Sequence, residues 1–440
     1  MDCLLKLGTI FQRLTAVLCG KFVEELAIIS DFIGSYERTR RKVCSKLKPT
    51  VLLVTAARWF PTARLAVALA DAGCTVQAVC PPGHPIAKTT AVEHTFTYRG
   101  LAPLKSISAA LAATNPDLLV SCDDLATGHL HALYAQNAGA GKSGSAICAL
   151  IERSIGAPEN FAIIDDRASF MQISERAGVR VPRTAIVTNS RDLDFFASQM
   201  DFPMVLKANG TSGGDGVRVV RTIEEAQRAF RTLQAPPLLA RAVKRALFDR
   251  NTTLLRPSLL RHQSSVIAQS FIPGTEATSA VVCWKGEVLA SLHFEVLQKS
   301  APAGHATVLR RVAHPEMATA AESMVRRLQL SGFHGFDFML DHKFGHVYLI
   351  EINPRATQVS HLNLGTGHHL PAALIAAFRG TTAGSSVSVT ENDVVALFPQ
   401  EWRRDPASQY LHSGYHDVPR DQPGLVRAGF RAPGARNLRK

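Results

Sequence analysis

The sequence lacks the cysteine patterns of disulfide-bonded and zinc-binding proteins. Its eight cysteines are scattered, and no two of them form a C-x-x-C pair. We therefore expect reduced thiols and a cytoplasmic location, because disulfide frameworks form in oxidising compartments. We also expect no secretory signal, because no small-residue cleavage site follows the N-terminal apolar segment. Charged residues interrupt that segment too early for a membrane-spanning helix.

Also absent is the interleaving of basic and aromatic residues that is typical of RNA-binding modules. The net charge is nevertheless +13, which favours acidic partners such as nucleotides, nucleic acids or anionic lipids. This charge is concentrated between Arg38 and Lys48 and along the C-terminal tail from Arg403. We expect no nucleic-acid partner, and a chain of 440 residues is large enough for two or three cores.

Residues 1–48 are predicted to form an amphipathic helical extension. Apolar residues recur at helical spacing from Leu4 to Leu26, while Lys6, Arg13 and Glu24 lie on another face. We expect this helix to pack on the body of the protein or on a second copy, so a homodimer is the simplest oligomer. Adhesion to a membrane surface is the alternative, but Glu24 interrupts the uniformly basic face that such helices usually keep. No membrane-surface contact is therefore expected.

Residues 49–150 alternate between short apolar segments and helical patterns, which predicts a small parallel sheet with helices on both faces. The apolar segments TVLLVTA, CTVQAVC and LLVSCDD are each followed by a helical stretch. Asp123 and Asp124 end the third segment, at the edge where open α/β sheets bind ligands. They could equally cap the next helix. The sequence alone leaves both interpretations open.

One apparent nucleotide motif in this region is rejected. The letters GAGKS at residues 139–143 are similar to a phosphate-binding loop, but Gln136 stands where that motif requires a glycine. The segment also follows a predicted helix, whereas the phosphate-binding loop follows a strand. We therefore place no nucleotide there.

The most informative stretch, residues 332–355, predicts two antiparallel strands joined near Lys343–Gly345. Alternation along a strand places Glu351 and Asn353 on one face. With the turn in that position, Asp337 lies opposite Glu351 within about a residue and on the same face, so two carboxylates and an amide share this face. Closely placed carboxylates repel each other. A hard divalent cation such as Mg²⁺, which carries nucleotide phosphates, removes that repulsion.

A glycine-rich segment between residues 203 and 220 predicts a phosphate contact. Glycines permit positive φ and let backbone N–H groups approach phosphate oxygens. Those of this segment are Gly210, Gly213, Gly214 and Gly216. Lys207 ends the strand before the loop, where its ammonium can meet the same phosphates. Such a loop alone is weak evidence, because hairpins use the same residues.

Together these segments resemble the ATP-grasp superfamily, in its carbamoyl-phosphate synthase and biotin carboxylase branch, from about Gly156 to Gly380. The Glu-x-Asn-Pro-Arg motif after an aspartate-bearing strand, and Lys207 before the glycine loop, carry the resemblance. It implies an α/β and α+β chain in which a small parallel α/β domain precedes a two-lobed ATP-grasp domain. The expected divisions are residues 1–48, residues 49–150, residues 151–385 with a flexible lobe at about 183–265, and a loose basic extension at residues 386–440.

The resemblance also implies roles for individual residues, with ATP and Mg²⁺ (or Mn²⁺) as cofactors. The implied metal ligands are Asp337, Glu351 and Asn353. The implied nucleotide contacts are Arg167, Lys207, the four glycines, Gln269, Phe271, Ile272 and Glu276. The implied catalytic cations are Arg355, Arg310 and Lys299, and His361 is a candidate substrate contact. Family members often have glutamate where Gln269 stands, which puts a contact with the adenine amino group in doubt.

The reaction that the resemblance implies is ATP-dependent ligation of a small-molecule carboxylate to an amine. The carboxylate attacks the γ-phosphate, and the amine or another nucleophile then displaces phosphate from the acyl phosphate. This chemistry requires positioning and charge neutralisation rather than a protein nucleophile. Two alternatives stay open, namely a bicarbonate-using carboxylase or carbamoyl-phosphate-type enzyme, and a nucleotide-binding scaffold without turnover. Gln358, Val359 and Ser360 stand where the biotin carboxylase motif has a glutamate, which weighs against the first alternative.

Overall fold

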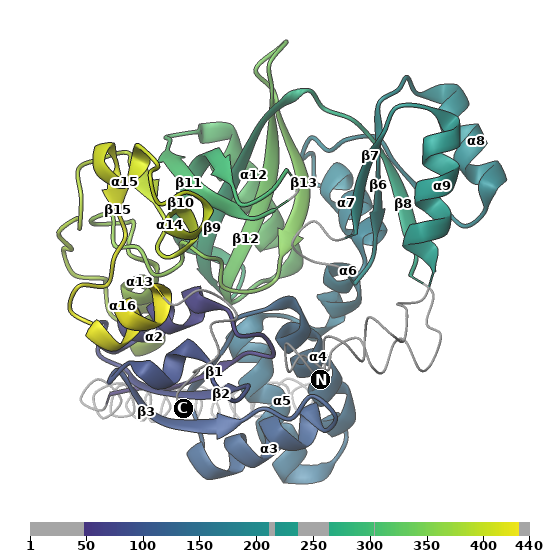
Figure 1. The fold of residues 1–440 in the computed structure, drawn as a ribbon. Coiled ribbons are helices and arrows are strands. Elements are labelled where there is room, and N and C mark those ends of the chain that lie inside the picture. Colours follow the sequence, from purple (N-terminus) through teal and green to yellow (C-terminus); the bar gives the residue numbers. More distant parts are fainter. Residues whose placement is uncertain (1–47, 211–215, 236–263, 303, 431–440) are drawn as a thin grey trace, which may run out of the picture. The chain divides into compact units, whose positions relative to one another are not determined.

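The computed structural model describes residues 48–210, 216–235, 264–302 and 304–430. The predicted N-terminal helix with its dimer contact, Gly213, Gly214 and the last ten residues lie outside these ranges. Within them, no helix is both long and apolar enough to cross a membrane. Figure 1 shows three sheets, each with its own set of helices.

The first sheet is parallel, as predicted, with strand order β3-β2-β1-β4. Leu52 and Val54 of β1 pack in one apolar cluster, while Val51 and Leu53 point the other way and are equally buried. Both faces of the sheet are therefore covered, which explains why its strands read as continuous apolar runs. The elements of this region are β1 (Thr50–Val54), α2 (Phe60–Asp71), β2 (Thr75–Cys80), η1 (Pro85–Lys88), β3 (Val92–Thr97), α3 (Pro103–Thr114), β4 (Leu118–Ser121), α4 (Asp124–Asn137) and α5 (Gly141–Ile155).

The rejected GAGKS segment lies at the corner between α4 and α5. It connects two helices rather than a strand and a helix, so the rejection is confirmed. Three short helices then lead into the second half of the chain. They are η2 (Pro158–Asn160), α6 (Phe161–Asp165) and α7 (Arg167–Arg176).

A four-stranded antiparallel sheet of order β5-β8-β6-β7 forms a separate lobe. Its core joins Leu206 of β6 to Phe196 of α8 and Phe230 of α9. The elements of the lobe are β5 (Thr184–Val187), α8 (Ser190–Gln199), β6 (Met204–Ala208), β7 (Val217–Val220), α9 (Ile223–Gln234) and β8 (Val266–Ser270).

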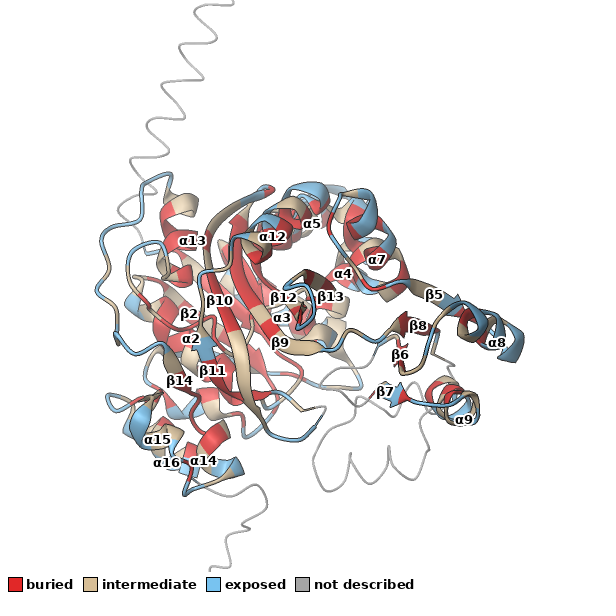
Figure 2. Ribbon diagram, turned by 90° about the horizontal axis from the view of Figure 1, so that it is seen from above, coloured by how far each residue is buried: buried red, intermediate tan, exposed pale blue. Residues whose placement is uncertain are grey.

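The largest sheet has seven strands in the order β13-β12-β9-β10-β11-β14-β15. Helix α12 covers one face, where Met324 packs with Val281 of β9 and with Phe336 and Phe338 of β12. Figure 2 shows β12 as buried along most of its length. The elements are β9 (Gly274–Trp284), β10 (Glu287–Lys299), β11 (Ala306–Arg311), α12 (Pro315–Leu328), β12 (Gly332–Asp341), β13 (Val347–Asn353) and α13 (Leu370–Arg379).

The C-terminal segment differs from the loose basic extension predicted for residues 386–440. Residues 394–430 instead form β14 (Val394–Ala396), α14 (Gln400–Arg404), α15 (Tyr410–Ser413), β15 (Tyr415–His416) and α16 (Pro423–Phe430). Strand β14 pairs with β11 and extends the seven-stranded sheet. Composition misled the prediction of a loose tail, because this arginine-rich segment also contains the buried acids Glu401 and Asp417.

Asp417 connects three distant segments through a buried ion pair and a buried hydrogen bond. Its carboxylate accepts hydrogen bonds from Arg64 of α2 and from Nε2 of His361, the latter at 2.7 Å. His361, the candidate substrate contact, is therefore engaged in a structural pair.

Replacing Asp417 tests whether this segment is an integral part of the fold. Asp417→Ala leaves Arg64 and His361 buried without their shared partner, so we expect the free energy of unfolding to fall by about 3–5 kcal/mol. Urea denaturation measures this loss. The control is Asp421→Ala, an exposed acid of the same segment, which should change stability by less than about 0.5 kcal/mol. Equal stability of the two variants would contradict the assignment.

Candidate functional site

The site is built on the hairpin of β12 and β13. Asp337 pairs with Glu351, as predicted. Beyond this pair the register shifts by one residue, so Ile350 is the extra residue of a β-bulge. The bulge changes the alternation, and Leu349 and Ile352 both enter the apolar core. Glu351 remains on the opposite face, beside Asp337.

Asp337 is a partly buried carboxylate with two hydrogen-bond donors. Thr278 Oγ1 donates to its Oδ1 at 2.8 Å, and Asn353 Nδ2 donates to its Oδ2 at 2.8 Å. Burial, and then the neighbouring Glu351 carboxylate, raise the pKa of Asp337 to about 6. A raised pKa of this origin means that the surroundings do not fully compensate the negative charge.

Glu351 is compensated by a cation from another element. Arg167, the first residue of α7, donates from Nη2 to Glu351 Oε1 at 2.6 Å. Burial acts to raise the pKa of Glu351, but Arg167 and then Lys207 outweigh it, and the net direction is downward. The two acids are therefore in different states, one neutralised by arginine and one not.

Lys207 reaches this hairpin from β6 of the smaller lobe. Its Nζ donates to the carbonyl oxygen of Ile350 at 3.1 Å, so the bulge supplies the acceptor. Only 5% of Lys207 is exposed, and burial lowers the pKa of its ammonium to about 8. Arg167 and Lys207 were both predicted as phosphate contacts. In the structure Arg167 bonds to the Glu351 carboxylate, and the charge of Lys207 acts on the same group.

The residues on this face fit a hard divalent cation. The described part of the chain contains no group of three or more His, Cys, Asp or Glu side chains that could hold a metal ion. The set formed here has two carboxylates, and the amide of Asn353 would be its third ligand. Oxygen donors of this kind suit Mg²⁺ or Mn²⁺. An uncompensated carboxylate such as Asp337 would be stabilised by the added positive charge.

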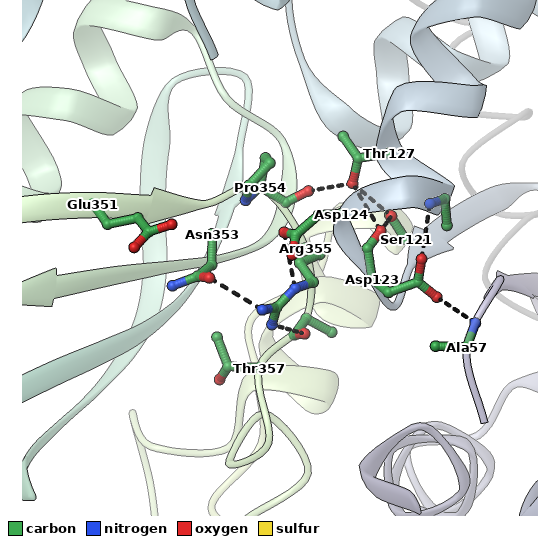
Figure 3. A network of polar contacts seen from close by, with 12 residues as sticks. Ala57, Ser121, Asp123, Asp124, Thr127, Glu351, Asn353, Pro354, Arg355 and Thr357 are labelled. Carbon is green, nitrogen blue, oxygen red and sulfur yellow. Dashed lines mark hydrogen bonds and ion pairs between the residues drawn. The ribbon is translucent and has the colours of Figure 1, made fainter. Parts of the chain in front are cut away.

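Arg355 lies at the edge of this face and is held on several sides (Figure 3). Its Nε donates to Asp124 Oδ1 at 3.0 Å, and its Nη2 donates to Asn353 Oδ1 at 3.1 Å. The guanidinium carbon stands 5.1 Å from the centre of the Trp59 ring. Burial acts to lower the pKa of Arg355, but Asp124 outweighs it and the pKa is raised.

The structure separates the two interpretations left open for Asp123 and Asp124. Asp123 caps α4, because its side chain accepts a hydrogen bond from the backbone N–H of Ala126 at 2.9 Å. Asp124 instead forms the ion pair with Arg355. One acid is thus a helix cap, and the other faces the candidate site.

The predicted nucleotide contacts from Gln269 to Glu276 lie in β8, in the connection after it and in β9. Gln269 is buried, and its Nε2 donates to Thr184 Oγ1 of β5 at 3.0 Å, so its side chain is engaged within the lobe. Phe271 and Ile272 belong to the connection between β8 and β9, where their backbone is outside either strand. Glu276, predicted to accept ribose hydroxyls, pairs with Lys299 Nζ at 2.5 Å.

One predicted catalytic cation, Arg310, is on the wrong face of the sheet. It pairs across strands with Glu295 and then Ala277, and Ala277 belongs to the core beneath α12. Asp337 pairs across strands with Thr278, Thr278 with Phe294, and Phe294 with Arg311. These residues form one row across the sheet, so Arg311 lies on the face of Asp337. Adjacent arginines point to opposite faces of a strand, and the sequence alone does not fix the register that decides between them.

Two contacts of the site were not predicted. Thr278 donates to Asp337, and alternation from Glu276 two residues earlier is a signal that could have revealed it. Trp59 lies against Arg355 although nearly three hundred residues separate them, and no local pattern predicts such a contact.

The buried lysine yields a test of the site without any ligand. The pKa of Lys207 falls from 10.5 to about 8 on folding, so between these values the unfolded chain binds more protons than the folded one. Stability therefore rises with pH across this window. Relative to Lys207→Met, the free energy of unfolding of the wild type should rise by up to about 3 kcal/mol from pH 8 to pH 10.5.

Chemical denaturation of the nucleotide-free protein at several pH values measures this difference. The matched control is Lys105→Met, which removes an exposed lysine of α3 and should give a curve parallel to that of the wild type. A Lys207→Met curve that is also parallel would show that Lys207 is not buried as described.

Comparison with known proteins agrees with this geometry. Residues 166–370 match the family model for the carbamoyl-phosphate synthase L chain, ATP binding domain. The carbamoyl phosphate synthase large chain of Thermus thermophilus is 25% identical over 249 residues, which cover 56% of this chain and 22% of that protein. The chain thus spans about a fifth of the length of that curated relative.

Solved structures share the fold at lower identity. An N5-carboxyaminoimidazole ribonucleotide synthetase in complex with ADP superposes with a TM-score of 0.53 at 16% identity, covering 78% of this chain and 79% of that one. The biotin carboxylase of Campylobacter jejuni gives 0.54 at 15% identity, covering 79% and 74%. The chain has the fold of these ATP-grasp proteins, and residues 166–370, just under half of the chain, are similar to the ATP-binding domain of the carbamoyl-phosphate synthase L chain.

Proposed function

We propose that the chain is an ATP-dependent ligase that activates a carboxylate as an acyl phosphate and transfers the acyl group to an amine or another nucleophile. The observation that carries the proposal is the cross-strand pair of Asp337 and Glu351, with Arg167 bonded to Glu351 and Lys207 bonded to the neighbouring carbonyl of Ile350. Two acids and two cations from four elements, β12, β13, α7 and β6, converge there. Similarity to the family model supports the same reaction class.

Lys207 and Arg167 are proposed to bind the phosphates of ATP. Both cations are held near the hairpin by contacts with protein oxygens, so nucleotide phosphates would replace or join acceptors that are already in position. Gly210 has a φ of +69°, a conformation in which glycine is preferred, and it begins the loop whose backbone would approach the phosphates. The connection at Phe271 and Ile272 is proposed to border the base.

Asp337, Glu351 and Asn353 are proposed to hold Mg²⁺. When bound, the cation neutralises phosphate charge and orients the γ-phosphate for attack. The chain's own contribution is to keep these ligands on one rigid strand pair and to place Arg355 beside them. Arg355 is proposed to steady either the transferring group or the substrate acid.

The reaction would proceed in two steps. A carboxylate oxygen bonds to the γ-phosphorus as the bond to the leaving ADP oxygen breaks. The nucleophile then bonds to the acyl carbon, phosphate leaves, and the amine loses a proton. Bicarbonate is the second candidate acid, because a matched solved structure is named as a carboxylase. ADP release that depends on added bicarbonate would select this alternative, whereas release that depends on an organic acid and an amine would select the first.

Removing one carboxylate charge tests the proposed reaction. Glu351→Gln keeps the side-chain size but removes a ligand charge and the ion pair with Arg167. We expect ADP release to fall by at least about tenfold, since metal-assisted charge stabilisation is worth several kcal/mol. A coupled assay over a panel of acids and amines, with bicarbonate as a separate condition, measures this.

The matched control is Glu322→Gln, an exposed glutamate of α12, which should keep wild-type turnover. Turnover of Glu351→Gln above a tenth of wild type would refute the metal-ligand role. A wild-type protein that binds ATP but releases no ADP under any condition would instead favour the scaffold.

A further inference from the structure

The inference concerns the crevice at the carboxyl end of the parallel sheet. Strand β1 has β2 on one side and β4 on the other, so the strand order reverses between β1 and β4. Open α/β sheets bind their ligands in the crevice outside this switch point. Here the crevice borders a segment of the same chain, residues 353–357, which follows β13.

Asp123 fixes the two loops that form the crevice. Its Oδ2 accepts hydrogen bonds from Thr55 Oγ1 at 2.7 Å and from the N–H groups of Ala56 and Ala57 at 2.7 and 3.2 Å. Its Oδ1 accepts from Ala126 N–H at 2.9 Å. The carboxylate therefore ties the loop after β1 to the start of α4, and its acceptor positions are taken.

Two hydrogen bonds that do not involve Asp124 hold the backbone of residues 353–357 in place. Thr127 Oγ1 donates to the carbonyl oxygen of Pro354 at 2.8 Å, and Ala356 N–H donates to the carbonyl oxygen of Ser121 at 3.0 Å. Figure 3 shows these residues around the segment. The path of the backbone is thus set by β4 and α4, and only the orientation of the Arg355 side chain remains to be fixed.

Four groups contact the guanidinium. Asp124 accepts from Nε, Asn353 accepts from Nη2, the carbonyl oxygen of Ala356 accepts from Nη1 at 3.3 Å, and the indole of Trp59 lies against the guanidinium. The guanidinium thus joins the α/β domain to Asn353, one of the proposed metal ligands. Within the described residues, Asp124 is the only carboxylate that accepts a hydrogen bond from the Arg355 side chain.

We propose that Asp124 is a positioning residue that keeps the Arg355 guanidinium on Asn353 and prevents it from pairing with the carboxylates of the proposed metal site; the role in turnover rests on the proposed function. After Asp124, the acid whose charge acts most strongly on Arg355 is Asp337, so without Asp124 the guanidinium would be drawn toward Asp337. An arginine drawn to Asp337 would compete with the cation for that carboxylate. The α/β domain therefore contributes to the metal site indirectly, by holding a competitor away from it.

The first experiment separates this role from a merely structural one. Asp124→Asn should lower kcat for ADP release by at least about tenfold and raise the half-saturating Mg²⁺ concentration severalfold, with the KM for ATP within about twofold of wild type. Asp124→Glu, which restores the charge, should recover most of both parameters. The control Glu93→Gln, an exposed acid of β3, should change neither.

The structural alternative gives a different result. If Asp124 only holds the domains together, Asp124→Asn would lower the urea midpoint and reduce activity in proportion, with an unchanged Mg²⁺ requirement. That outcome would overturn the proposal.

A second measurement does not depend on turnover. Because Arg355 lies against Trp59, releasing it should change Trp59 fluorescence. Asp124→Asn should therefore shift the emission of the full-length protein, and the same substitution should have no effect in an Arg355→Ala or a Trp59→Phe background. An equal shift in the Arg355→Ala background would show that Asp124 does not act through Arg355. If the wild type releases no ADP with any substrate, the proposed function fails, while this measurement still decides whether Asp124 holds Arg355.

Discussion

The close approach of two partly buried carboxylates on one face of a hairpin is the constraint on which the site depends. Asp337 and Glu351 are directly paired across β12 and β13, and loss of water makes each charge costly. Arg167 neutralises Glu351 from α7, and Lys207 reaches the bulge carbonyl of Ile350 from the smaller lobe. Loss of water, and then the Glu351 charge, raise the pKa of Asp337, and a divalent cation bound there would stabilise its charged form. Both lobes thus bring cations to one hairpin.

Two further parts of the chain support this hairpin from outside the matched family segment. The parallel sheet holds residues 353–357 at its switch point through Ser121 and Thr127. The C-terminal segment extends the sheet through β14 and engages His361 through Asp417. His361 lies six residues after Arg355, so the loop that carries this arginine is held at both ends. The regions before and after the ATP-grasp segment therefore form part of the support of the site.

The parts of the site that local patterns encode were predictable from the sequence. Strand alternation and a polar turn place Asp337 within about a residue of the position opposite Glu351, and the β-bulge at Ile350 completes the pair. Glycine density marks the loop that begins at Gly210. Contacts that depend on register or on distant packing were not predictable. A single residue of register decides that Arg311, rather than Arg310, shares the row of Asp337. Two partners of Arg355, Trp59 and Asp124, lie more than two hundred residues away from it in the chain.

The most direct test of the central claim is the affinity for ATP with and without Mg²⁺, measured by titration calorimetry on the wild type and on a double variant, Asp337→Asn with Glu351→Gln. Without metal, the two acids repel phosphate, so the double variant should bind ATP at least as tightly as the wild type. With Mg²⁺, the wild type should bind at least about tenfold more tightly than it does without metal, and the double variant should gain little. Equal wild-type affinity in the two conditions would contradict the claim that this carboxylate pair is a metal-dependent phosphate site.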